Sequence, residues 1–91
     1  MRPVQFAVVD TDLDTLRFYA DRLAAKAERF ALVCTAGDDK KFVLLTKTDC
    51  DLQPVMQTLR KRCGARGGGR DNVMQGSLAA TEKELRAALD L

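Results

Sequence analysis

The residues with the clearest chemical potential lie in the stretch KRCGARGGGRDNVMQG, residues 61–76. Three consecutive glycines, Gly67, Gly68 and Gly69, stand between Arg66 and Arg70. Glycine adopts positive φ without steric cost and lets a ligand approach the backbone closely. Successive N–H groups can then form a concave anion-binding nest. The pattern is typical of a phosphate-binding loop. A cramped crossing from a helix to a strand explains the same glycines equally well.

The charges near the glycines are unevenly distributed. Residues 52–70 contain five cations and no acid, whereas the whole chain has 15 basic and 13 acidic residues. The remainder therefore carries a net negative charge, and a basic block on an acidic domain is an electrostatic footprint for phosphate, although a solvated face is an equally good interpretation. The predicted site has Arg66 and Arg70 as phosphate contacts and the three glycines as backbone donors. The predicted flanking basic patch consists of Arg60, Lys61 and Arg62. Gln75 is expected to bind either the ligand or the loop backbone.

The composition excludes several kinds of chemistry. The chain has no histidine, so it cannot form a Ser-His-Asp triad, a Cys-His pair or a histidine-ligated metal site by itself. Cys34, Cys50 and Cys63 are odd in number and contain no C-x-x-C pair, which argues against a disulfide framework or a zinc knuckle. We expect Cys34 and Cys63 to be buried thiols. The sequence therefore predicts a chain without catalytic activity, cofactor or metal.

The chain is long enough for one α/β domain. Apolar runs such as residues 30–34 are too short to span a membrane, and the N-terminus lacks the pattern of a signal peptide, so we expect a cytoplasmic protein with no membrane contact. The four phenylalanines look like core positions, and Tyr19 is expected to be exposed.

Hydrophobic periodicity, caps and turn residues predict the order β-α-β-β-α-β-α, with a mixed sheet of about four strands and three helices. Strands are expected over residues 4–9, 30–35, 41–46 and 73–78, the second and third forming a hairpin. The glycines fall in a loop over residues 65–70. The helix signals are caps at residues 10–12, Pro54 in a first turn, Gly64 at a C-terminus and a capping box at residues 81–84.

The segment GGGRDNVMQGS, residues 67–77, resembles the glycine-rich signature of the DHH-associated domain. The three glycines, Arg70, Gln75 and Gly76 fit the signature. The sequence departs from it at Asp71, Asn72, Val73, Met74 and Ser77. The resemblance covers nearly the whole chain, because VVDTDLDTLRFYADRLAAK, FALVCTAGDDKKFVLLTKT and TEKELRAALDL follow the family's elements in the same order.

This resemblance implies the C-terminal domain of an alanyl-tRNA synthetase, or of a related alanyl-tRNA editing protein. Residues 1–91 would then be a single domain cut from the C-terminus of a longer protein. Its partners would be tRNA, specifically alanine tRNA, and the remaining domains of the parent, with a homodimer left open. The domain would bind the tRNA phosphate backbone and help couple aminoacylation with editing.

Two alternatives remain at this stage. The first is the substrate-binding domain of a DHH-type phosphodiesterase, in which the three glycines resemble a motif that continues with histidine; Arg70 at that position favours the tRNA branch. The second is a dimerisation or protein-interaction module, in which the glycines are only a structural crossing.

Overall fold

The structure is a computed structural model that describes residues 2–37, 39–70 and 72–91. Asp71, one of the departures from the family signature, therefore lies outside the described residues. Strands and helices are interspersed along the chain, as expected for an α/β domain. In chain order they are β1 (Arg2–Val8), α1 (Leu13–Ala24), β2 (Ala27–Cys34), β3 (Lys40–Leu45), α2 (Gln53–Cys63), β4 (Arg66–Arg70), β5 (Val73–Leu78) and α3 (Glu82–Ala88).

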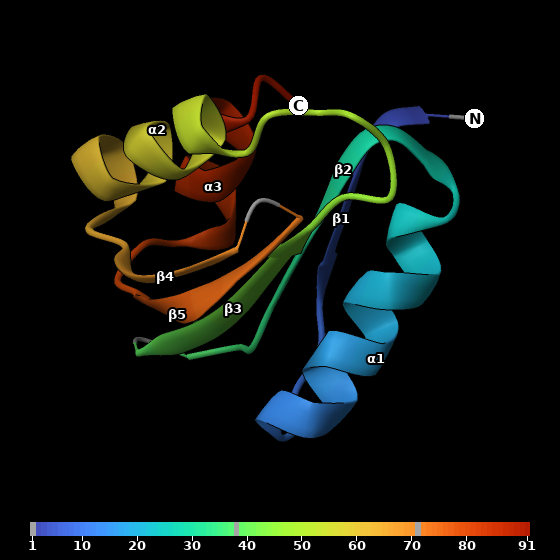
Figure 1. Cartoon of the computed structure of the whole chain (residues 1–91). Coiled ribbons are helices and arrows are strands. Elements are labelled where there is room, and N and C mark those ends of the chain that lie inside the picture. The colour runs from blue at the N-terminus through green and yellow to red at the C-terminus, as the bar shows by residue number, and fades with distance from the viewer. Residues whose placement is uncertain (1, 38, 71) are drawn as a thin grey trace.

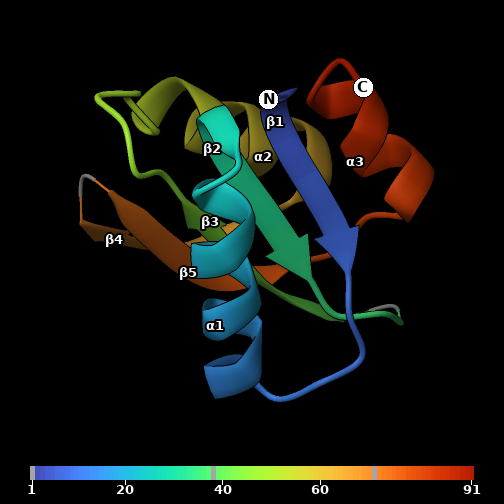
Figure 2. The ribbon, with the colours of Figure 1, turned by 90° about the vertical axis from the view of Figure 1, so that its right-hand side faces the viewer.

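The strands form one mixed sheet in the order β1-β2-β3-β5-β4 (Figure 1). β1 and β2 are parallel and are joined through α1, whereas every other neighbouring pair is antiparallel. α1 lies on one face of the sheet, and α2 and α3 lie together on the other (Figures 1 and 2). The order leaves β4 at one open edge.

The two faces of the sheet bury cores of different sizes. Alternate strand residues point to opposite faces, so Leu32 and Cys34 pack beneath α2 and α3 while Val33 packs beneath α1. The core under α1 is small, and its fully enclosed members are Leu16, Ala20, Val33 and Val43. Leu16 is the one large α1 side chain that is completely buried. A single leucine therefore supplies much of the attachment of α1.

The predicted helix signals are confirmed by the hydrogen bonds at the helix ends. The Asp12 carboxylate accepts from the Thr15 amide at 2.8 Å, and this backbone hydrogen bond holds the pKa of Asp12 below its ordinary value. Thr81 and Glu84 form the reciprocal capping box of α3. Gly64 ends α2 in the left-handed conformation, with φ 64°. The longest of the described helices has 12 residues, too few to cross a membrane.

The prediction of a loop over residues 65–70 is wrong, because Arg66–Arg70 is the edge strand β4 of a five-stranded sheet. It forms an antiparallel hairpin with β5. Glycine has low strand propensity, so no local signal identified this strand; pairing with β5 provides its order. The expectation of four core phenylalanines is also wrong for Phe18, whose side chain is 60% exposed. α1 buries a narrow stripe that Phe18 does not share.

The thiols give a first prediction, because Cys34 and Cys63 are confirmed as buried and Cys50 is half-buried. Burial desolvates the thiolate and raises the pKa of Cys34 to about 11, and it raises the pKa of Cys63 as well. We expect one fast-reacting thiol when the native protein is titrated with a disulfide reagent at pH 8, and three after denaturation. Cys50→Ser should remove the fast phase. Three fast thiols in the native protein would contradict this assignment.

Candidate nucleic-acid interface

The pairing of β4 with β5 places the two predicted phosphate contacts on one face of the sheet. Directly paired residues of antiparallel strands share a face. Arg66 pairs with Ser77, Gly68 with Gln75 and Arg70 with Val73. Val73 packs against the core under α1, so this is the face that α1 covers. Arg66 and Arg70 therefore flank Gly68 on the α1 side of the open edge.

This part of the sheet is hollowed because α1 packs mainly on β2 and β3. One hollow of about 570 Å³ reaches from the start of α1 to Arg66, and a second of about 440 Å³ reaches from Arg17 to Arg70. Gln75 lines both, so the two hollows adjoin each other, and together they are named the β4 groove. Its floor is the β4–β5 hairpin and its wall is the first half of α1.

The β4 groove is electropositive. Among the residues that the structure describes, its lining carries four cations, Arg17, Lys41, Arg66 and Arg70, and one acid, Asp12. The Asp12 carboxylate is already occupied as the cap of α1. The neutral polar side chains of Asn72, Gln75 and Ser77 supply further hydrogen-bonding groups. This combination suits an anionic ligand that also offers hydrogen-bond partners.

The glycines of the hairpin divide into two kinds. A Cβ added at Gly67 would overlap the carbonyl oxygen of Gln75 and lie 2.7 Å from the Cα of Gly76, and Gly67 also has φ +127°. A Cβ at Gly69 would overlap the carbonyl oxygen of Val73. These two glycines are required by close strand pairing. An added Cβ at Gly68 would find no atom nearer than the Arg60 Nη2 at 4.0 Å, so no packing reason demands glycine there.

The glycines do not form the concave loop expected from the sequence. They are part of an extended strand, in which successive N–H groups point to opposite sides. The Gly67 carbonyl accepts from Arg60 Nη2 at 3.1 Å, which shows that it points away from β5 toward the open edge. Backbone donors from this segment would therefore act along the edge of the sheet and not as a nest.

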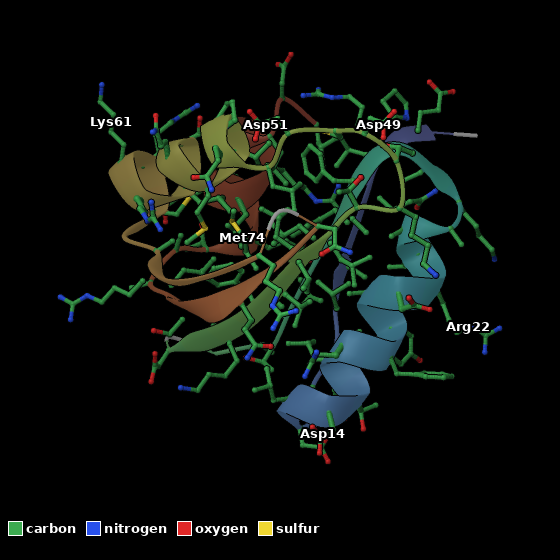
Figure 3. All side chains as sticks on the ribbon, viewed as in Figure 1. Asp14, Arg22, Asp49, Asp51, Lys61 and Met74 are labelled. Carbon is green, nitrogen blue, oxygen red and sulfur yellow. The ribbon has the colours of Figure 1, made fainter. Side chains whose placement is uncertain are left out.

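Only one member of the predicted flanking patch adjoins the groove, namely Arg60, whose Nη2 would lie 4.0 Å from a Cβ added at Gly68. Arg60, Lys61 and Arg62 belong to α2, on the opposite face of the sheet from α1. Arg60 reaches the edge of β4, whereas Arg62 donates to the Ala87 carbonyl of α3 at 3.5 Å. Lys61 points into solvent on the side of the molecule away from α1 (Figure 3). The basic block of the sequence is thus divided between two surfaces.

Two cations of the groove were not predicted from the sequence. Arg17 comes from α1 and Lys41 from β3, both far from the glycines in the chain. Strand register brings Lys41 close, because Lys41 pairs with Ser77 and Ser77 pairs with Arg66 in one row across three strands. Only knowledge of the strand pairing could have revealed this row.

Comparison with known proteins identifies the family of this chain. The family model described as the DHHA1 domain matches residues 2–91. The chain belongs to the DHHA1 domain family. The resemblance expected from the glycine signature is therefore confirmed.

A solved structure has the same fold as this DHHA1 domain. It is the C-Ala domain from Aquifex aeolicus alanyl-tRNA synthetase, with a TM-score of 0.75 and 21% sequence identity over 96% of this chain and 84% of that one. No curated protein matches the chain significantly. The shared fold agrees with the predicted α/β architecture, including three helices packed on a mixed sheet.

Proposed function

We propose that this DHHA1 domain is a tRNA-binding accessory domain of an alanyl-tRNA synthetase or related editing protein. The observation that carries the proposal is the β4 groove, in which Arg66 and Arg70 flank Gly68 on an open, electropositive face. The fold shared with the C-Ala domain supports the choice of RNA. The cellular partners would be alanine tRNA and the other domains of a parent protein in the cytoplasm.

The geometry suits a ligand with several phosphates. Residues four apart on an extended strand are separated by about 13 Å at their Cα atoms, so Arg66 and Arg70 would contact phosphates that are not neighbours. Arg17 and Lys41 add charge from the wall and the floor. Such contacts position an RNA backbone and follow its shape without reading its sequence. Selection of alanine tRNA would come from the parent protein.

The domain would act by holding RNA and would contribute no chemical step of its own. The chain lacks histidine, and its two most buried thiols have raised pKa values, which leaves them poor nucleophiles. Coupling of aminoacylation with editing would then follow from keeping one tRNA attached while its acceptor end moves between sites elsewhere in the parent.

The test is tRNA binding across a salt series with an Arg66→Ala/Arg70→Ala variant. Each lost charge-assisted hydrogen bond costs about 1.5–3 kcal/mol, so we expect the loss of two to lower the affinity at least roughly 100-fold. The slope of log K against log salt should become shallower by about 1.5 when two phosphate contacts are lost. Lys61→Ala/Arg62→Ala is the matched control, because it removes the same charge from the other face.

Each pattern of results has a definite meaning. Retained binding in the α2 variant with loss in the groove variant supports the β4 groove as the RNA site. Equal binding by the wild type and the groove variant would leave the glycines as a structural feature of the sheet edge. A wild-type domain that binds no tRNA at low salt would favour an interaction module instead.

A further inference from the structure

The outer face of α1 exposes two neighbouring aromatic side chains. Phe18 is 60% exposed and Tyr19 is 45% exposed, although both are large enough to be valuable in a core. Leu16, Ala20 and Ala24 bury the opposite side of the helix. Aromatic side chains gathered at one exposed place are typical of a binding surface.

A hollow of about 400 Å³ lies at this place, and its lining is chemically simple. Within the part of the chain that the structure describes, it consists of the two aromatic side chains, Leu23 and the two cations Arg22 and Lys26, with no acid. The Arg22 guanidinium carbon lies 5.7 Å from the centre of the Phe18 ring. Arg22 points away from the sheet into solvent (Figure 3). We name this surface, residues 18, 19, 22, 23 and 26, the α1 aromatic patch.

The α1 aromatic patch is separate from the β4 groove. None of the five residues that line the patch also lines the groove, whose contact from this part of α1 is Arg17. Asp21 lies one turn after Arg17 and forms an ion pair with Lys47 at 2.8 Å. An acidic position thus stands beside the groove-facing side of α1, and the cations of the patch lie beyond it.

We propose that the α1 aromatic patch is a second RNA contact, which stacks an unpaired nucleobase on Phe18 and Tyr19 and holds adjacent phosphates with Arg22 and Lys26. The proposal rests on the proposed function, namely that the domain binds RNA. A nucleotide matches both parts of the lining, because every base has a π-face for the aromatic rings and its phosphate is complementary to the cations. The groove would supply backbone contacts, and the patch would hold a base.

The chain contains its own reporter for this test. It has one tyrosine and no tryptophan, so its intrinsic fluorescence comes from Tyr19. We would titrate the domain with an alanine tRNA transcript and correct for absorption by the RNA with free N-acetyltyrosinamide. Base stacking should quench the fluorescence of Tyr19. The quenching curve should coincide with the binding curve obtained from the fluorescence anisotropy of the RNA. The Arg66→Ala/Arg70→Ala variant should shift that curve to higher RNA concentration and still reach the quenched end point.

Substitution of Phe18 separates stacking from charge. Phe18→Ala should weaken binding roughly 5- to 100-fold with an unchanged salt slope, as expected for loss of one stacked base, and Phe18→Leu should recover only part of the affinity. Because Phe18 is exposed, both variants should keep the thermal midpoint of the wild type.

Three outcomes would overturn the proposal. RNA binding with no Tyr19 quenching and no effect of Phe18→Ala would reject the α1 aromatic patch while leaving the proposed function intact. A Tyr19 signal that changes with protein concentration in the absence of RNA would assign the patch to self-association. A wild-type domain that does not bind RNA would reject both proposals together.

Discussion

Gly67→Ala and Gly76→Ala are each expected to destabilise the domain by about 3 kcal/mol or more, whereas Gly68→Ala should change its stability by less than about 1 kcal/mol. A Cβ at Gly76 would overlap the Arg66 carbonyl oxygen and lie 2.9 Å from the Cα of Gly67. These atoms are backbone, so relief would require β4 and β5 to separate. Gly68 has no such neighbour.

Urea denaturation of the three single variants and the wild type would measure these differences. Gly68→Ala is the control, because it makes the same chemical change one residue away in the same strand. If all three variants lost similar stability, close pairing of the two strands would not be the reason for the glycines. Similar stability of Gly67→Ala and the wild type would contradict the positive φ and the backbone overlap together.

The same series bears on function, because Gly68 lies in the β4 groove between the two arginines. Packing explains Gly67, Gly69 and Gly76. It does not explain Gly68, where a missing side chain keeps the groove floor open to a ligand. Close packing therefore accounts for Gly67 and Gly69, whereas the phosphate contact that we propose for this strand would involve Gly68.

The sequence predicted those elements whose signals are local. The Asp12 cap, the capping box that begins at Thr81 and the C-terminal Gly64 each act through residues within one turn of a helix, so they could be identified from spacing alone. β4 has no comparable signal, because three of its five residues are glycine. Its order comes from β5, and that pairing is a tertiary property.

The candidate site could be predicted only in part for the same reason. Arg66 and Arg70 are four positions apart on a strand and therefore share a face, but a loop assignment gives no faces at all. Proximity in sequence also grouped the cations of α2 with the glycine segment. The left-handed Gly64 ends α2, the chain turns into β4, and Lys61 is left on the opposite face from Arg66. Charge composition identified the basic region, and strand register determines which of its cations lie on the same face.

Leu16→Ala is expected to lower the free energy of unfolding by about 3–4 kcal/mol and to weaken tRNA binding beyond the effect of lost stability. Leu16 is completely buried and is the one large side chain that α1 places in its small core. A domain of this length is stable by roughly 5–14 kcal/mol, so the variant should still fold. Its weakened element would be α1, whose first half forms the wall of the β4 groove.

Leu59→Ala is the matched control, because Leu59 is equally buried but belongs to α2 on the other face. Hydrogen exchange should show faster opening of the α1 amides in Leu16→Ala and not in Leu59→Ala, since local opening follows local packing. At conditions where both variants are fully folded, tRNA affinity should fall in the Leu16 variant alone. An equal loss in both would mean that α1 does not shape the RNA site. The β4 groove would then act through its strands without its helical wall.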